Sequence, residues 1–190
     1  MLISILAEQV QKQHYKYFMQ IKSEPSPDFE FLPKEQAANI KVGLLVSEWN
    51  IKITSALLKK CIETLEKHHI SKENIELKWI PGSFELPLGA QWMFEYRHVD
   101  AVACLGCIIQ GETPHFQFIS ESVALTIGQL AIKYNRPVAF GVITANTDQQ
   151  ALDRAGGKVG NKGEEAAIAL LKMLKVKSEF AEPKSTLGFK

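Results

Sequence analysis

The residues best suited to proton transfer and anion binding stand in one loop, QGETPHF, at positions 110–116. Gly111, Glu112 and Thr113 precede a segment of helical spacing. The free backbone N–H groups and the positive dipole end of such a helix favour an anion, and His115 beside them has a side chain that titrates near neutral pH. An anion site next to a proton carrier suits a reaction that expels phosphate. A plain helix N-terminus with a surface histidine is the alternative.

Two other segments carry aromatic and acidic groups that suit an organic ligand. In PGSFELP, Pro81 and Gly82 end an apolar stretch, and Phe84 and Glu85 follow them. A carboxylate accepts hydrogen bonds from the hydroxyl groups of a polyol, while a ring forms a wall of the site. A tight turn with Phe84 in the core fits this pattern equally well. Trp49 follows an earlier apolar run, where its ring is placed to stack on a flat heterocycle.

Cationic groups gather in a glycine-rich stretch, DRAGGKVGNKG. It contains Arg154, Lys158 and Lys162 among four glycines. Glycine lets the backbone approach a ligand closely, and the fork of donors on Arg154 suits a phosphate group. The strings GxxxxGKS/T and GxGxxG do not occur in the sequence. Their absence disfavours a P-loop NTPase and weakens a dinucleotide-binding interpretation.

The elements that must position these groups alternate along the chain. Short apolar runs predict four strands, at Lys41–Val46, Asn74–Ile80, Asp100–Ile109 and Pro137–Thr144. Helical spacing and capping residues predict helices at Ile53–His69, Pro87–Tyr96, Gln117–Tyr134, Asp148–Arg154 and Glu164–Val176. This order predicts a three-layer α/β fold, with a mostly parallel four-stranded open sheet and helices on both faces. Ligands then bind beyond the carboxyl ends of the strands, where all the loops described above begin.

The domain organisation follows from the same pattern. Residues 1–38 are predicted to form an N-terminal arm and linker, with a possible amphipathic helix over Met1–Ile21 and three prolines after it. Residues 39–177 are predicted to form one domain that carries the chemistry. Residues 178–190 are predicted to form a loosely held C-terminal tail.

Charge and cysteine content narrow the class of protein. With 22 basic and 21 acidic residues, the net charge is +1, too small to recruit nucleic acid or an anionic membrane. No apolar run approaches the ~20 residues that a membrane-spanning helix needs. Three cysteines favour a reducing, cytoplasmic compartment. Cys104 and Cys107 form a CxxC string on a predicted strand, where they point to opposite faces and cannot share a metal ion. We therefore expect no metal site.

Taken together, these segments resemble the lumazine synthase family. SEWN, PGSFELP, LGCIIQGETPHF, PVAFGVITANTDQQALDRAG and GNKGEEAA occur in that family's order and spacing, from about Asn39 to Val176. The resemblance implies a flavodoxin-like fold and a transferase that needs no cofactor. Its reaction would condense 5-amino-6-(D-ribitylamino)uracil with 3,4-dihydroxy-2-butanone 4-phosphate to 6,7-dimethyl-8-ribityllumazine, releasing phosphate and water in the penultimate step of riboflavin biosynthesis.

The resemblance also assigns roles to individual residues. His115 matches the proton-transfer residue, and Gln110 replaces a frequent arginine before the phosphate loop. The pyrimidine and ribityl chain would be bound by Trp49, Ser83, Phe84, Glu85, Ile108, Ile109, Phe140 and Lys162. The phosphate would be bound by Gly111, Glu112, Thr113 and Arg154. Phe140, Arg154 and Lys162 match residues supplied by an adjacent subunit, so the implied partner is a second copy in a homopentamer or a pentamer-based assembly.

Two other functions stay open at this level. A riboflavin synthase on the same fold would use two lumazines and no sugar phosphate. A non-catalytic flavin or lumazine binder would bind tightly without turnover. The segment Gln117–Tyr134 carries apolar residues around much of its circumference, more than packing on one sheet requires. This surplus favours an oligomer over a helix buried within its own subunit.

Overall fold

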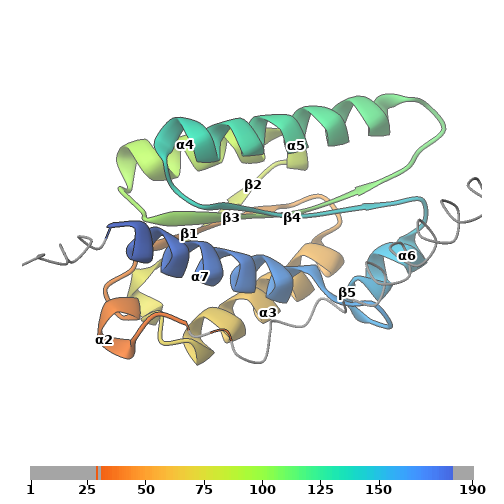
Figure 1. Cartoon of the computed structure of the whole chain (residues 1–190). Helices are drawn as coiled ribbons and strands as arrows, with labels where there is room; N and C mark the ends of the chain where they lie inside the picture. The colour runs from red at the N-terminus through yellow and green to blue at the C-terminus, as the bar shows by residue number, and fades with distance from the viewer. Residues whose placement is uncertain (1–28, 30, 182–190) are drawn as a thin grey trace, which may run out of the picture. The chain divides into compact units, whose positions relative to one another are not determined.

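A computed structural model of the chain describes Phe29 and residues 31–181. The amphipathic helix expected over Met1–Ile21 lies outside these residues. Four strands form one sheet: β1 (Val42–Ser47), β2 (Ile75–Ile80), β3 (Ala101–Ile109) and β4 (Val138–Ala145). Their order is β2-β1-β3-β4, and every neighbouring pair is parallel (Figure 1). The predicted α/β fold with a parallel four-stranded core is thereby confirmed.

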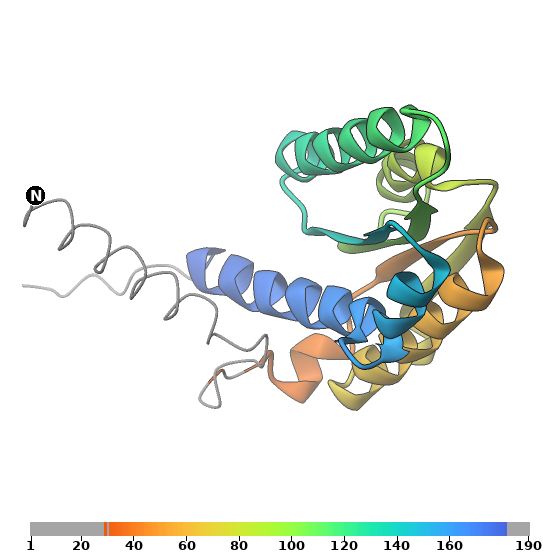
Figure 2. The same ribbon diagram turned by 90° about the vertical axis from the view of Figure 1, so that its right-hand side faces the viewer.

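Helices cover both faces of this sheet (Figures 1 and 2). One face is covered by α3 (Ile51–Lys67) and α7 (Lys162–Ala181), and the other by α4 (Leu86–Tyr96) and α5 (His115–Tyr134). Shorter elements complete the described chain: α2 (Lys34–Ala37), η1 (Lys72–Asn74), η2 (Ser83–Glu85) and α6 (Asp148–Asp153). Because every main strand runs in the same direction, the loops after β1, β2, β3 and β4 meet at one edge of the sheet.

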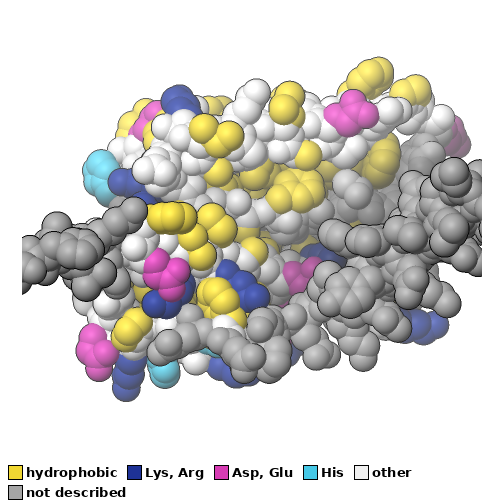
Figure 3. Space-filling model, viewed as in Figure 1, with side chains coloured by type: hydrophobic (Ala, Val, Ile, Leu, Met, Phe, Trp, Pro, Cys, Tyr) yellow, Lys and Arg dark blue, Asp and Glu magenta, His cyan; other side chains and the backbone are white. Residues whose placement is uncertain are grey.

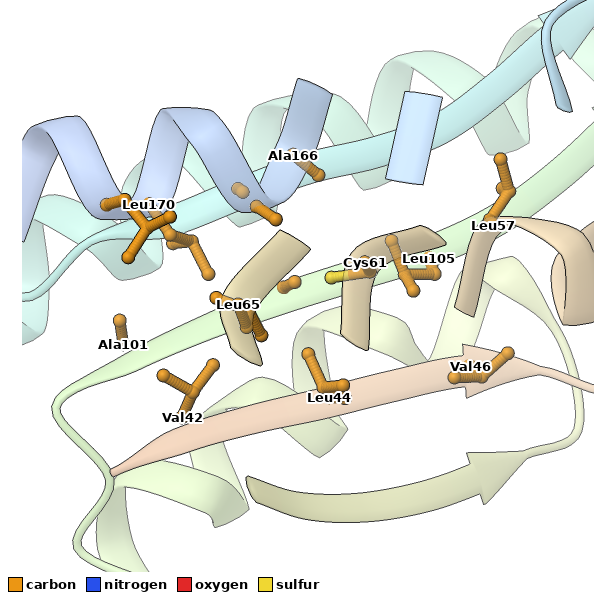
Figure 4. Packing of buried hydrophobic residues seen from close by; sticks show 14 of the residues in the cluster. Val42, Leu44, Val46, Leu57, Cys61, Leu65, Ala101, Leu105, Ala166 and Leu170 are labelled. Atoms are coloured by element: carbon orange, nitrogen blue, oxygen red, sulfur yellow. The ribbon is translucent and has the colours of Figure 1, made fainter. Parts of the chain in front are cut away.

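The core is divided into two layers by the sheet. On the α3 and α7 side, Leu44, Leu57 and Leu105 pack together, as the side chains in Figure 4 show. On the α4 and α5 side, residues including Leu45 and Cys104 form the second cluster. Neighbouring residues of a strand alternate between the layers because successive side chains point to opposite faces.

The two cysteines of the CxxC string belong to different layers. Cys107 lies in the α3 and α7 cluster and Cys104 in the α4 and α5 cluster, as the strand geometry predicted. Burial raises the pKa of both thiols to about 12. At neutral pH both are therefore protonated, and neither is a nucleophile.

Helix α7 approaches α3 most closely at Gly163. A Cβ atom built there would lie 2.0 Å from the carbonyl oxygen of Leu57, so Gly163→Ala must push the two helices apart. We expect this substitution to lower the free energy of unfolding by about 3 kcal/mol or more, measured by urea denaturation. Glu164→Ala, at an exposed position on the same turn, is the control and should cost less than about 1 kcal/mol. Equal losses in both variants would contradict this packing account.

The structure differs from the sequence prediction at α5, at α7 and in the glycine-rich stretch. Helix α5 begins at His115 instead of Gln117 because Pro114 acts as its N-cap and its carbonyl accepts hydrogen bonds from the Gln117 and Phe118 amides. Helix α7 continues to Ala181, five residues beyond the expected end at Val176. The glycine-rich stretch, predicted as a simple break, forms an antiparallel pair, β5 (Ala155–Gly157) and β6 (Gly160–Asn161). Positive φ angles at two of its glycines permit this tight turn.

Two further features concern the ends of the described chain and its helices. Part of the stretch assigned to the arm packs on the core, since Leu32 and Ala37 are buried beside α3. Within residues 31–181, no helix is both long and apolar enough to cross a membrane.

Candidate functional site

A pocket of about 670 Å³ opens at the carboxyl ends of the strands. It is lined by the turn after β1, the η2 segment, the end of β3, the first turns of α5, and the start of α6. The lining residues are Trp49, Asn50, Gly82, Ser83, Phe84, Glu85, Cys107, Ile108, Ile109, Gly111, Thr113, His115, Phe116, Ile119 and Asp148. Segments far apart in the sequence thus meet where the topology of a parallel sheet predicts a ligand site.

The aromatic wall of the pocket is presented by a tight turn. Asn50 adopts a left-handed conformation, with φ 58° and ψ 43°, and its side-chain amide donates a 3.1 Å hydrogen bond to the carbonyl of Cys107. This bond joins the start of α3 to the end of β3. Trp49, just before the turn, is left 72% exposed. An exposed indole held by a fixed backbone is suited to stacking on a flat ring.

Ser83 is the most unusual polar group in the pocket lining. Its side chain is 6% exposed, and its Oγ has no hydrogen-bond partner among the described residues. Space for this hydroxyl depends on Gly106, where an added Cβ would come within 2.6 Å of the Ser83 Oγ. A buried hydroxyl without a partner costs ~1–3 kcal/mol. Such a group is accounted for if a bound ligand supplies the missing hydrogen bond.

His115 is the first residue of α5 and is exposed at the pocket. The free amide groups of the first turn of this 20-residue helix point outward at its positive end. Thr113 and Gly111 line the pocket directly before it. A helix N-terminus and an imidazole therefore meet at this pocket.

The pocket lining is acidic. Glu85 and Asp148 contribute carboxylates, and no lysine or arginine is among the described residues that line it. The negative charge of Asp148 adds to burial in raising the pKa of Cys107. A phosphate ester would meet like charge here with only helix amides to offset it. A cation from elsewhere would therefore strengthen the binding of a doubly charged phosphate at this pocket.

Comparison with known proteins decides the family. A sequence profile described as 6,7-dimethyl-8-ribityllumazine synthase matches residues 39–178. The chain belongs to the lumazine synthase family. A protein of that name from Cytophaga hutchinsonii is 55% identical over 132 residues, covering 70% of this chain and 83% of its own length. Another from Bacteroides fragilis is 50% identical over 135 residues, covering 71% and 94%. A third from Parabacteroides distasonis is 44% identical over 147 residues, covering 77% and 92%.

The resemblance to lumazine synthase assigned thirteen residues to the site. In this chain they fall into those that line the pocket and those that do not. Nine of them line the pocket: Trp49, Ser83, Phe84, Glu85, Ile108, Ile109, Gly111, Thr113 and His115. Four do not: Glu112, Phe140, Arg154 and Lys162. Three of these four are the residues that the resemblance placed on an adjacent subunit. Glu112 is an exposed loop residue next to the lining positions.

Arg154 and Lys162 of this lumazine synthase family member do not line the pocket of their own chain, and a backbone hydrogen bond joins them. The Lys162 amide donates a 2.9 Å hydrogen bond to the carbonyl of Arg154, which joins the two ends of the β5–β6 hairpin. The Arg154 guanidinium donates to the carbonyl of Gln150 at 3.2 Å. Phe140 is exposed on β4, an edge strand of the sheet. Arg154 and Lys162 are partly exposed.

Sequence reasoning missed several pocket residues, notably Asn50 and Asp148. Both follow the carboxyl end of a strand, and that position was the available signal for a site role. Asn50 lies within the SEWN motif, and Asp148 lies at the start of a predicted helix. Cys107, Phe116 and Ile119 complete the apolar wall and could be recognised only from the fold.

Proposed function

We propose that the pocket condenses 5-amino-6-(D-ribitylamino)uracil with 3,4-dihydroxy-2-butanone 4-phosphate to form 6,7-dimethyl-8-ribityllumazine. The observation that carries this proposal is the meeting, in one pocket, of an exposed indole, an unpartnered buried hydroxyl and a histidine at a helix N-terminus. Trp49 would stack on the pyrimidine, and Ser83 and Glu85 would bind hydroxyl groups of the ribityl chain. The backbone at Ile108 and Ile109 would face the pyrimidine edge. All three reported relatives carry the name of this activity.

The chemistry can be written as balanced steps. The 5-amino group attacks the ketone carbon, and loss of one water gives an imine. A proton is then removed from the hydroxyl-bearing carbon, and phosphate leaves from the terminal carbon. The enol that results tautomerises to a methyl ketone. The ribityl-bearing nitrogen attacks this second carbonyl and closes the ring with loss of a second water. His115 would carry protons between these steps, a role typically worth ~10²–10⁴-fold in rate. Holding both substrates in one pocket supplies much of the remaining acceleration.

The phosphate would lie at the N-terminus of α5, near Gly111, Glu112 and Thr113. Backbone amides there stabilise negative charge on the leaving group. We propose that Arg154 of a neighbouring copy supplies the cation that the pocket lacks, and that Phe140 and Lys162 of the same neighbour close the pyrimidine end. Supporting this, the pocket lining has two carboxylates and no basic side chain among the described residues.

We propose that the working form is a homopentamer or an assembly of pentamers. Helix α5 carries an exposed apolar stripe at seven-residue spacing, formed by Phe118, Leu125 and Ile132, which are 69%, 64% and 84% exposed. Figure 3 shows further hydrophobic side chains between the layer of α5 and that of α7. A stripe and patch of this kind favour burial against another subunit.

The state of the cysteines bears on where the enzyme acts. Its three cysteines are buried and free, as suits a reducing compartment, and we propose that it acts in the cytoplasm. Residues 39–177 would form the catalytic domain. Residues 1–38 would form an arm, the last part of which packs on the core, and residues 178–190 a tail that begins within α7.

The direct test supplies both substrates to the purified protein. Absorbance should report lumazine formation, with one phosphate released for each lumazine. Formation of riboflavin from lumazine without phosphate release would indicate a riboflavin synthase. Tight binding of lumazine without turnover would indicate a binding protein.

Ser83→Ala is expected to make the protein more stable and to weaken its binding of the pyrimidine. Removing an unpartnered buried hydroxyl should raise the free energy of unfolding of the ligand-free protein by about 1 kcal/mol. Loss of a hydrogen bond to the ribityl chain should raise the KM for the pyrimidine about 5-fold. Chemical denaturation and steady-state kinetics measure the two effects. A variant that is less stable and binds the pyrimidine normally would show that Ser83 serves packing instead.

A further inference from the structure

Asp148 brings to the pocket a carboxylate that the fold itself does not use. It is the first residue of α6 and lines the pocket. The preceding residue caps the helix, since the Oγ1 of Thr147 accepts a 3.2 Å hydrogen bond from the amide of Gln150. Among the described residues, no hydrogen bond or ion pair engages the Asp148 side chain. Its acceptor oxygens are therefore left for a ligand in the pocket.

The position of α6 fixes the side of the pocket on which this carboxylate lies. Ala151 of α6 is buried in the core cluster of α3 and α7, and α6 lies on that side of the sheet (Figure 1). Burial and the nearby negative charge of Asp148 raise the pKa of the Cys107 thiol, which faces the same layer, to about 12. Trp49 stands at the start of α3. Asp148 and Trp49 thus share one side of the pocket, and the N-terminus of α5 belongs to the other face of the sheet.

The two proposed substrates respond in opposite ways to a carboxylate at this place. A carboxylate only accepts hydrogen bonds. The aminopyrimidine carries N–H donors on its ring and at its 5-amino group, and a charge-assisted hydrogen bond from one of them is stronger than a neutral one. The sugar phosphate carries two negative charges, which the same carboxylate repels.

We infer that Asp148 is a specificity-determining residue. Its carboxylate accepts a hydrogen bond from an N–H group of the pyrimidine stacked on Trp49, and its charge keeps the sugar phosphate at the α5 end of the pocket. Each substrate is thereby directed to its own end of a shared site. This inference rests on the proposed function.

The test replaces Asp148 by asparagine, which has nearly the same shape and no charge. In the full-length protein, Asp148→Asn should raise the KM for the pyrimidine about 5- to 10-fold. It should lower the KM for the sugar phosphate about 2-fold at low ionic strength, and salt on the order of 0.5 M should remove this second effect. Isothermal titration calorimetry with the pyrimidine alone should show the same loss of affinity without turnover.

Glu48→Gln is the matched control for the loss of charge. Glu48 is exposed, adjoins Trp49 in the sequence and does not line the pocket. Its removal should leave the affinity for the pyrimidine unchanged. If Glu48→Gln weakened pyrimidine binding as much as Asp148→Asn, the effect would be one of overall charge, and the inference would be wrong.

Two further results would overturn the inference and leave the proposed function intact. One is an active Asp148→Asn enzyme with an unchanged KM for the pyrimidine. The other is an equal rise in both KM values, which would indicate that Asp148 supports the structure of α6. If the unmodified protein forms no lumazine, the proposed function is wrong, and calorimetry with the pyrimidine alone still decides whether Asp148 binds it.

Discussion

His115→Ala is expected to lower kcat by about 10-fold or more while the KM for the pyrimidine stays nearly constant. The imidazole stands at the first turn of α5, at the edge of the pocket. There it can move protons, but it is not part of the aromatic platform on which the pyrimidine would stack. General acid–base catalysis is typically worth ~10²–10⁴-fold. We expect a loss of about 10-fold or more, at or below the low end of this range, because the substrates carry amine and hydroxyl groups that partly shuttle protons themselves. Steady-state kinetics with each substrate varied in turn measure the effect.

His98→Ala is the matched control for this substitution. His98 is exposed on the chain between α4 and β3 and does not line the pocket, so its removal should leave kcat unchanged. If kcat were also unchanged in His115→Ala, the imidazole would have no part in the reaction.

Arg154→Ala is expected to raise the KM for the sugar phosphate by about 30- to 100-fold and the KM for the pyrimidine far less. A guanidinium forms charge-assisted, bidentate hydrogen bonds with phosphate, and such bonds are stronger than neutral ones. The acidic lining of the pocket makes this cation more important, since Glu85 and Asp148 repel the phosphate. Kinetics with the sugar phosphate as the varied substrate provide the measurement.

Arg154→Lys separates charge from geometry. It retains the positive charge and loses the fork of donors, so its KM for the sugar phosphate should lie between those of the unmodified enzyme and Arg154→Ala. Equal increases in the KM of both substrates would indicate that Arg154 supports the β5–β6 hairpin, and that its role is structural.

The sheet and its helices could be predicted from the sequence because their residues obey simple periodicities. The apolar runs around Leu44 and Leu105 fill both faces of buried strands, which is the pattern of a parallel sheet. The turn after β2 could be placed from Pro81 and Gly82. Because parallel strands end at one edge, placing Trp49, Glu85 and His115 in one pocket followed from topology alone.

Other features depend on contacts that no local pattern reveals. Predicting that α5 starts at His115 would have required knowing that the Pro114 carbonyl closes its first turn. Three of the five strand residues in the β5–β6 hairpin are glycine, so hydrophobic periodicity gives no signal for it. The unpartnered Ser83 hydroxyl exists because Gly106, on a different strand, leaves room for it. Each of these is a tertiary effect that overrides or adds to local propensity.

The most direct test of a site shared between subunits is recovery of activity from two impaired variants, measured at a sugar phosphate concentration where each alone is slow. His115→Ala and Arg154→Ala proteins are unfolded, mixed and refolded together, and lumazine formation is followed by absorbance. Each variant refolded alone gives the baseline, and light scattering gives the assembly state. If Arg154 completes the pocket of a neighbour, some interfaces in the mixture pair an intact His115 with an intact Arg154, and activity should rise well above either baseline. Activity that stays at the average of the two variants, or a fully active monomer of the unmodified protein, would contradict the shared site.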